Sequence, residues 1–247
     1  MTGRSEIEQT EDAILGGRVR LRQPGRGYRV AIDPVLLAAA VAAAPEERIL
    51  DAGTGTGAAA LCLARRCAGV RIVGLERDPV LLALARDNTR ANGLEDRVSI
   101  LGGDLLEPCR EAPFDRVMTN PPFDLRGCAT APAQASAAAA HQGEADAGAW
   151  VAACLARLRP RGWLTLIHRP DVLPALLGAL AGRAGDVVLF PLWPSADAPA
   201  ARRVIVTARK GARGPARLSR GLVLHGPDGR YTEAAEAVLR HAAPLEP

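Results

Sequence analysis

Asn120, Pro121, Pro122 and Phe123 form the stretch of the chain whose residue types are best suited to chemistry. They follow the apolar run 114–119, which predicts a short buried strand, and two consecutive prolines prevent that strand from continuing in a sheet. The resulting turn would present two acceptors, the Asn120 side-chain oxygen and the Pro121 carbonyl, beside the aromatic face of Phe123. Two acceptors and a stacking face suit a planar group that carries an NH2. The alternative is an ordinary turn with a polar cap.

A glycine-rich stretch upstream, 51–57, has the sequence Asp51-Ala52-Gly53-Thr54-Gly55-Thr56-Gly57 and is a second candidate for ligand binding. It joins a predicted strand, which includes residues 48–50, to an apolar helix over residues 58–67. Glycines allow the backbone to approach a ligand closely, and a helix start favours a negative group. The glycines also fit a looser dinucleotide-binding pattern, so by themselves they are weak evidence.

Two acids follow the next predicted strands. Glu76 ends a strand over 70–75 and lies 23 positions beyond Gly53, near the spacing at which an acid holds ribose hydroxyls. Asp104 follows a strand over 97–101, and it either caps a helix that begins at Leu105 or faces a ligand. Both acids are therefore candidates for the same site as the glycines.

Strands and helices alternate along the chain, which predicts an α/β protein with a mostly parallel sheet covered on both faces. Residues 1–12 are expected to be disordered, and 13–247 to form a single domain with extensions at 13–45 and 209–247. Asp33 is expected to cap a helix over 35–44, and Asp78 a helix that ends near Asn92. The remaining predicted elements are helices over 150–159, 172–181 and from 232, and strands over 162–168, 186–192 and 202–208.

The composition favours a soluble protein of a reducing compartment. The 247 residues are 48% hydrophobic, with a net charge of +4 and a pI of about 9.1. Five cysteines without a C-x-x-C pair argue against a disulfide framework or a zinc site. The longest apolar run, 35–44, is too short to span a bilayer, and the first twelve residues do not resemble a signal peptide. We expect a cytoplasmic protein that binds neither membrane nor metal.

Two stretches concentrate positive charge. Arg18, Arg20 and Arg22 alternate with apolar residues, which predicts that they share one face of a strand. With Arg26 and Arg29 they make five arginines without an acid. A second run contains Arg209, Lys210, Arg213, Arg217 and Arg220. Each stretch is either a solvated edge protected from aggregation by its charge or a contact for the phosphate backbone of a nucleic acid.

The two motifs together resemble those of a known enzyme class. The spacing Gly-x-Gly-x-Gly after an acidic strand end resembles motif I of class I S-adenosylmethionine methyltransferases. Asn-Pro-Pro-Phe resembles motif IV of those that methylate exocyclic or amide nitrogens. From about Ile14 to Leu239 the chain resembles the bacterial family that methylates the exocyclic amine of an adenine in the anticodon loop of a valine tRNA. The segments that carry this resemblance are 21–24, 27–29, 33–37, 51–57, 120–123, 167–170, 208–211 and 222–225.

The resemblance implies a Rossmann-like methyltransferase sheet of seven strands with the last strand antiparallel. It implies S-adenosyl-L-methionine as cofactor, S-adenosyl-L-homocysteine as product, a tRNA substrate, and a monomer or homodimer. Glu76 would hold the ribose, Asp51 the methionine end and Asp104 the adenine amine. The cofactor residues would be Tyr28, Arg29, Asp33, Asp51, Gly53, Gly55, Gly57, Glu76, Asp104 and Asn120, the catalytic residues Asn120, Pro121 and Phe123, and the RNA-binding residues Arg18, Arg20, Arg22, Arg209, Lys210 and Arg213.

Three other functions remain open at this point. Motif IV also occurs in enzymes that methylate the guanine amine of ribosomal RNA. Release-factor glutamine methyltransferases share it, but normally have a helical domain before the fold, whereas about 46 residues precede the first core strand here. A non-catalytic RNA-binding protein could keep the same fold. The Ala-rich stretch 129–149 is expected to be either a lid or part helix and part loop.

Overall fold

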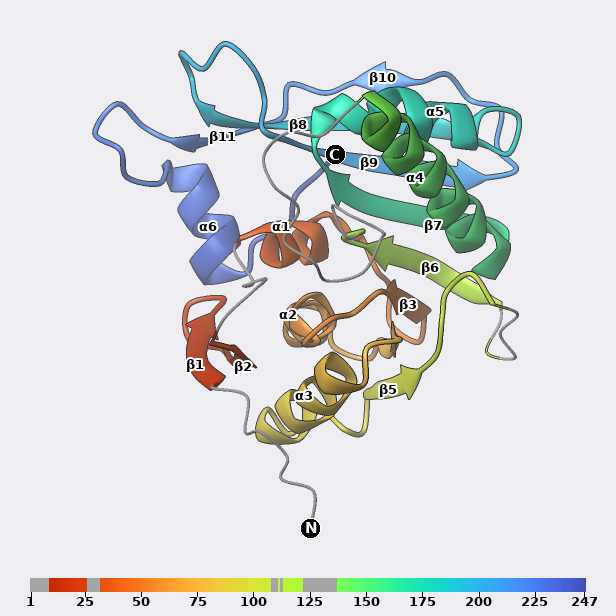
Figure 1. Ribbon diagram of the computed structural model, residues 1–247. Coiled ribbons are helices and arrows are strands. Elements are labelled where there is room, and N and C mark those ends of the chain that lie inside the picture. Colours follow the sequence, from red (N-terminus) through yellow and green to blue (C-terminus); the bar gives the residue numbers. More distant parts are fainter. Residues whose placement is uncertain (1–8, 26–31, 108–110, 112, 122–136) are drawn as a thin grey trace.

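The computed structural model describes residues 9–25, 32–107, 111, 113–121 and 137–247, and it centres on one β-sheet (Figure 1). Among these residues the parallel strands are β3 (Arg48–Ala52), β4 (Arg71–Glu76), β5 (Val98–Gly102), β6 (Phe114–Thr119), β7 (Leu158–His168) and β8 (Ala184–Ser195). A further strand, β9 (Arg203–Lys210), lies antiparallel between β7 and β8. The prediction of a mostly parallel sheet whose last core strand is antiparallel is confirmed.

The order of the core strands, β5-β4-β3-β6-β7-β9-β8, changes direction between β3 and β6. We call the edge at which the parallel strands end the carboxyl edge, and the edge at which they begin the amino edge. Open α/β sheets bind ligands at the carboxyl edge where the order reverses, which is here the end of β3 and β6. Two strands that the sequence did not predict, β10 (Arg217–Leu218) and β11 (Leu222–His225), pair parallel with β8 beyond the core.

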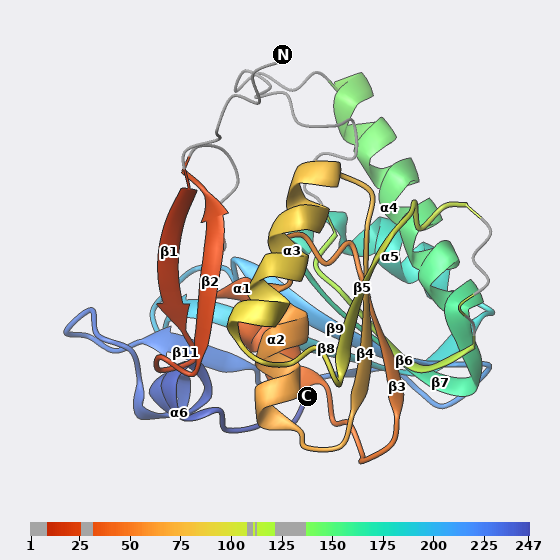
Figure 2. The same cartoon turned by 90° about the horizontal axis from the view of Figure 1, so that it is seen from below.

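Helices cover both faces of the sheet, as the sequence predicts (Figures 1 and 2). Successive residues of a strand point to opposite faces of the sheet, so Ile49 packs into one apolar cluster and Leu50 into the other. The first cluster contains residues of α1 (Asp33–Ala40), α2 (Ala58–Arg66), α3 (Pro79–Ala91) and α6 (Glu233–His241). The second contains residues of α4 (Ala137–Arg157) and α5 (Leu173–Leu180), the latter preceded by the 3-10 turn η1 (Pro170–Val172).

A separate β-hairpin packs against the helices of the first cluster (Figure 2). Its strands β1 (Gln9–Ile14) and β2 (Val19–Pro24) pair antiparallel. Val19 and Leu21 are fully buried, whereas Arg20 and Arg22 are exposed, so the predicted alternation is confirmed. Residues 9–12 were expected to be disordered, and this is wrong because they pair with β2; residues 1–8 lie outside the described residues.

The predicted helix cap at Asp33 is wrong, and the cap considered as an alternative for Asp104 is not formed. Asp33 is the first residue of α1 rather than its cap, and its carboxylate accepts from Arg203 Nε at 2.8 Å. The helix also ends at Ala40 and not at residue 44. No helix follows Asp104 in the described residues 105–107, where the chain forms a turn. The cap at Asp78 is confirmed, since its carboxylate accepts from the N–H groups of residues 80 and 81.

The described residues contain neither a membrane-spanning helix nor a cluster of metal ligands. No helix among them has the length and apolar character needed to cross a membrane. No group of three or more His, Cys, Asp or Glu side chains in the same part of the chain could hold a metal ion. The cysteines that the structure describes, Cys62, Cys67 and Cys154, are free thiols.

Candidate active site

The ends of β3 and β6 bring the starts of the two predicted motifs to one place on the carboxyl edge. Ala52 and Thr119 are paired residues, so Gly53 and Asn120 leave neighbouring strands at the same level. Asn120 is half-buried, and Pro121 is buried. Three predicted site residues lie outside the described residues: Tyr28, Arg29 and Phe123.

Glycines shape the loop after β3. Gly53, Gly55 and Gly57 have φ values of 71°, 59° and 88°, in the left-handed region that side chains disfavour. A Cβ on Gly53 would lie 3.0 Å from the ring of Trp150. A Cβ on Gly55 would meet no described atom within 4 Å. The backbone therefore requires glycine at all three positions, and the space beside Gly55 is open.

Asp51 supports this loop from within the protein. Its carboxylate is buried and accepts a hydrogen bond from the Thr54 hydroxyl at 2.5 Å. Burial raises the pKa of Asp51 from 3.8 to about 6, because the charged form loses its water. The Thr54 hydroxyl and the Ala60 N–H oppose this rise in pKa, and the charge of Glu76 adds to it. The contact of Asp51 with the methionine end of a cofactor stays a prediction.

Glu76 connects the glycine loop to the next helix. Its side chain is buried at the end of β4, where Oε2 accepts from the Gly55 N–H at 2.9 Å and Oε1 from the Asp78 N–H at 2.8 Å. A carboxylate has about four acceptor positions, so Glu76 keeps acceptor capacity for hydroxyl groups. Its position beside the open face of Gly55 is compatible with the predicted ribose contact.

Thr56 gives a direct sign that the loop is built for a polar ligand. Its hydroxyl is buried and has no hydrogen-bond partner among the described residues. Buried hydroxyls are nearly always hydrogen-bonded, so an orphan in a ligand-binding loop indicates a missing partner. Together with the open Gly55 and the acceptors of Glu76, it shows that these residues fit the nucleoside cofactor that the sequence predicts.

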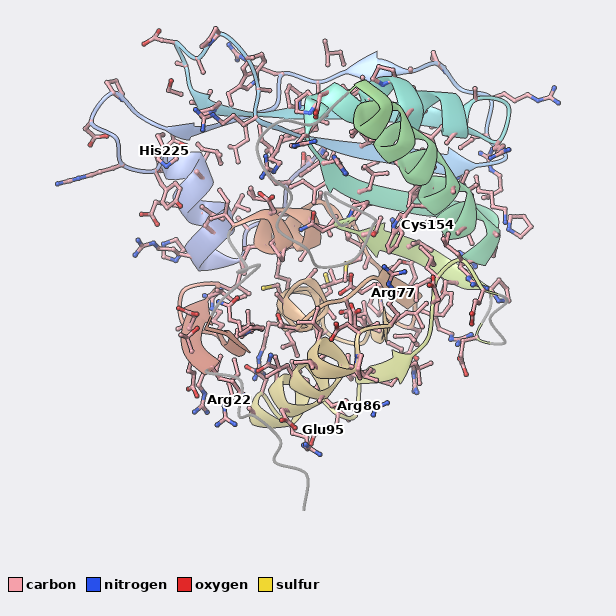
Figure 3. All side chains as sticks on the ribbon, viewed as in Figure 1. Arg22, Arg77, Arg86, Glu95, Cys154 and His225 are labelled. Atoms are coloured by element: carbon pink, nitrogen blue, oxygen red, sulfur yellow. The ribbon has the colours of Figure 1, made fainter. Side chains whose placement is uncertain are left out.

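Asp104 lies at the same edge, after β5. Its carboxylate accepts from the Leu106 N–H at 2.9 Å and forms an ion pair with Arg77 at 3.3 Å (Arg77 is labelled in Figure 3). The Gly103 N–H donates to the Glu76 carbonyl, which sets the two acids on adjoining loops. The contact of Asp104 with an adenine amine stays a prediction.

Sequence reasoning missed Trp150, which joins the two motifs. Its indole N–H donates to the Thr119 hydroxyl at 3.0 Å, and that hydroxyl donates to the Ala52 carbonyl at 2.7 Å. Thr119 and Ala52 are the residues directly before Asn120 and Gly53. Through these two hydrogen bonds, Trp150 of α4 holds in place the starts of both loops, at Gly53 and at Asn120. A lone tryptophan in an alanine-rich stretch was the available signal.

Asp33 and His168 also lie at the carboxyl edge. The ion pair between Asp33 and Arg203 joins the start of α1 to the start of β9, where Val204 pairs with His168. His168 is buried, and its Nδ1 accepts from the Arg169 N–H at 2.8 Å. Burial, then the charge of Arg169, lowers the pKa of His168 to about 4. The ring is therefore neutral near pH 7.

The two basic stretches occupy different environments. The hairpin arginines, by which we mean Arg18, Arg20 and Arg22, are exposed. The C-terminal cations, by which we mean Arg209, Lys210 and Arg213, lie at the amino edge, because Arg209 pairs with Trp163 in the first half of β7 and Lys210 with Ala184 at the start of β8. The structure therefore does not bring the C-terminal cations to the two motifs.

Comparison with known proteins identifies the family. Residues 29–167 match the family model of the methyltransferase small domain. A Porphyromonas gingivalis protein named tRNA1(Val) (adenine(37)-N6)-methyltransferase is 35% identical over 168 residues, which cover 64% of this chain and 66% of that protein. The chain thus spans just under two thirds of this relative. An Aeromonas hydrophila protein of the same name is 30% identical over 207 residues, which cover 83% of this chain and 86% of the relative.

Solved structures agree with this assignment. A predicted O-methyltransferase from Agrobacterium tumefaciens superimposes with a TM-score of 0.73 at 24% identity, covering 86% of this chain and 98% of that one, which shows the shared fold. A T. thermophilus 16S rRNA N2 methyltransferase, solved in complex with AdoMet and guanosine, has a TM-score of 0.56 at 26% identity and covers 82% of this chain and 50% of that one. Because the family model covers more than half of the 247 residues, the chain belongs to the methyltransferase small domain family, with the class I methyltransferase fold.

Proposed function

We propose that this protein transfers a methyl group from S-adenosylmethionine to the exocyclic amine of an adenine in tRNA. The proposal rests on the pairing of β3 with β6, which starts the glycine loop and Asn120 at the same level. It is supported by relatives named tRNA1(Val) (adenine(37)-N6)-methyltransferase, one of which aligns over 83% of this chain. S-adenosylmethionine supplies an electrophilic methyl group when it is bound.

The glycine loop and the buried acids hold the cofactor. Gly55 leaves room for close approach, Glu76 would offer acceptors to the ribose hydroxyls, and Thr56 would contribute a hydroxyl that has no partner among the described residues. Asp51 would attract the positive charge of the methionine end, and Asp104 would accept from the adenine amine. Asp33 would contribute to the same site, together with Tyr28 and Arg29, which lie outside the described residues.

Asn120 and Pro121 orient the substrate. An adenine amine is a poor nucleophile, because its lone pair is delocalised into the ring. The Asn120 side-chain oxygen and the Pro121 carbonyl each accept one hydrogen of the NH2, which turns the lone pair toward the methyl group and stabilises the charge that develops on nitrogen. Phe123 stacks on the base, which is already unpaired in an anticodon loop, where extrusion costs least. The nitrogen that has gained the methyl group would then lose one of its protons to water, which leaves a neutral methylated amine; His168, neutral near pH 7, is assigned no part in this step.

The substrate is a tRNA, and the hairpin arginines contact its phosphates. The relative that aligns over 83% of this chain is named as a tRNA methyltransferase, which supports tRNA over ribosomal RNA or a protein glutamine, whereas relatives named release factor glutamine methyltransferase align over 30% and 40% of it. The enzyme works as a monomer or homodimer in the cytoplasm. Its single domain includes residues 9–12 as well as 13–247, because β1 pairs with β2, and its extensions are 9–45 and 209–247.

The experiment that tests this function is nucleoside mass spectrometry. Purified protein is incubated with methyl-labelled cofactor and tRNA that lacks modifications, and the tRNA is digested to nucleosides. We expect a single labelled N6-methyladenosine, and far less of it from the Asn120→Ala variant over the same short incubation. Labelled methylguanosine, or label found only in protein, would contradict the adenine assignment and leave the fold and cofactor unaffected.

A further inference from the structure

Two asparagines, Asn88 in α3 and Asn92 directly after it, bind the backbone of β2 as a neighbouring strand would. Asn88 Oδ1 accepts from the Arg22 N–H at 2.8 Å, and Asn88 Nδ2 donates to the Arg22 carbonyl at 2.9 Å. Asn92 makes the same two bonds with the N–H and carbonyl of Arg20, at 3.0 and 2.7 Å. A side-chain amide carries the same donor and acceptor as a peptide group, so the two asparagines satisfy the edge of β2 that β1 leaves unpaired.

The spacing of the two elements explains why this ladder forms. Residues four apart on a helix have Cβ atoms about 5–6 Å apart, and residues two apart on a strand are separated by roughly 6.6 Å. Asn88 and Asn92 therefore match Arg20 and Arg22 in register. Asn88 is fully buried and Asn92 is 8% exposed, whereas the two arginine side chains point to solvent. The ladder thus fixes the backbone that carries the hairpin arginines.

Asn88 differs from Asn92 in one respect. Its Nδ2 also donates to the Thr56 carbonyl in the glycine loop at 2.9 Å. The additional bond of Asn92 goes to the Asn88 carbonyl, at 2.8 Å, and not to the loop. One buried side chain therefore touches both the hairpin and the loop whose Thr56 hydroxyl lacks a partner among the described residues.

We propose that Asn88 and Asn92 are positioning residues for the RNA-facing hairpin, and that Asn88 couples this hairpin to the cofactor loop. Ordering of the glycine loop by the cofactor fixes the Thr56 carbonyl, and through Asn88 it fixes the backbone of Arg22. By thermodynamic reciprocity, tRNA bound at the hairpin then strengthens cofactor binding by the same factor. The inference rests on the proposed function for the identity of the RNA.

The first test compares Asn88→Ala with Asn92→Ala, a matched control that removes the same hairpin bonds but no loop bond. Both variants should raise the KM for tRNA about 5- to 20-fold, within the usual range of coupling effects. Only Asn88→Ala should also raise the KM for S-adenosylmethionine and abolish the strengthening of S-adenosylhomocysteine binding by tRNA. Equal cofactor KM values in the two variants, with coupling intact, would overturn the proposal.

A second test uses the unaltered protein and no RNA, so it stands even if Asn88→Ala does not fold. Amide hydrogen exchange at Arg20 and Arg22 is measured with and without S-adenosylhomocysteine. We expect exchange to slow about fivefold or more when the ligand is bound, because opening of the hairpin is coupled to the loop. Unchanged exchange would refute the coupling. If the protein instead failed to methylate any tRNA, the proposed function would fail while this result stood.

Discussion

The hairpin arginines and the C-terminal cations are alike in sequence but differ in what they contact. In the hairpin, the backbone is held by Asn88 and Asn92 while the charged groups extend into solvent. Among the C-terminal cations, Lys210 Nζ donates to the Leu158 carbonyl at 2.6 Å, and Arg209 donates to the Arg161 carbonyl at 3.1 Å. The first group stays exposed, although Arg22 forms an ion pair with Glu11 at 3.4 Å across the hairpin, whereas two members of the second satisfy the protein's own backbone.

Other arginines at the amino edge, near the C-terminal cations, also have partners within the protein, in this case acidic side chains. Arg116 pairs with Glu47 at 2.6 Å, and Arg159 with Asp115 at 2.8 Å. The guanidinium of Arg209 also lies 5.6 Å from the ring centroid of Trp163, a cation–π distance. A run of positive residues therefore does not by itself indicate a nucleic-acid surface. Whether it can bind a nucleic acid depends on the contacts that its side chains already make within the protein.

The largest expected loss of activity comes from Asn120, which lies in neither basic stretch, and the effects predicted for the two stretches can be measured against it. Asn120→Ala should lower single-turnover methylation by about 100-fold or more, because one acceptor for the developing charge is removed. Cofactor and tRNA affinity should stay nearly unchanged, since Asn120 faces the reacting amine. Rapid-quench measurement at saturating substrates checks this, and an undiminished rate would remove the function assigned to motif IV.

Glu76→Ala should weaken S-adenosylmethionine binding roughly 10- to 100-fold, the scale of losing charge-assisted hydrogen bonds. The variant also frees the Gly55 N–H that Glu76 binds. Titration calorimetry measures the affinity, and Asp171→Ala, which removes an exposed acid paired with Arg169, is the control. Binding of NAD with no response to S-adenosylmethionine would contradict the cofactor assignment.

Replacing all three hairpin arginines with glutamine tests the comparison directly. Affinity for tRNA should fall about tenfold or more, and the salt dependence should flatten by roughly 0.7–0.9 log units for each phosphate that is no longer neutralised. The matched control replaces Arg209, Lys210 and Arg213 with glutamine, which removes the same charge from the amino edge. Equal changes in the salt slope of the two triple variants would break the distinction between the stretches.

The pH dependence of cofactor binding follows from Asp51. Its pKa of about 6 means that the carboxylate is mostly protonated at pH 5 and ionised at pH 7. A positively charged ligand favours the ionised form, so affinity for S-adenosylmethionine should rise with pH through about 6. The gain between pH 5 and 7 should be at most about tenfold, the change in the ionised fraction. In the Asp51→Asn variant the affinity should no longer rise with pH. If the rise remained, a group other than Asp51 would be responsible for it.

The smallest effect is expected at Lys210. Lys210→Met keeps the aliphatic stem but removes the donor to the Leu158 carbonyl. The free energy of unfolding should fall by about 1 kcal/mol, the typical value of one hydrogen bond. Affinity for tRNA should change less than twofold. Denaturant unfolding measures the stability, and filter binding measures the affinity for tRNA. A clear loss of tRNA affinity with unchanged stability would show that Lys210 contacts RNA instead of stabilising the fold.

Sequence patterns predicted the features that depend on neighbouring residues. The strand that includes residues 48–50, the glycines of the following loop and the cap at Asp78 are all local, and the structure confirms them, with the strand continuing to Ala52. Asp104 shows the limit of such reasoning: the sequence left open whether it caps a helix or faces a ligand, and its carboxylate in fact bonds within a turn and pairs with Arg77.

Contacts between distant segments could not be predicted in the same way. Trp150 reaches Thr119 from α4, and Asn88 reaches Arg22 across 66 positions of sequence. On a helix, Asn88 and Asn92 look like ordinary polar residues, and only the position of β2 shows what they bind. The strand pairing of residues 9–12 was missed for the same reason, since their polar composition favours disorder when the partner strand is ignored.

The position of β9 between β7 and β8 has a consequence for synthesis of the chain on the ribosome. Both neighbours of β9 precede it in sequence, and each pairs with it along most of its length. Until residues 203–210 have left the exit tunnel, β7 presents an open edge, and β8 lacks the strand that connects it to the rest of the sheet. The nascent protein therefore completes its sheet only after most of the chain has been made, and both open edges are sites of mispairing until then.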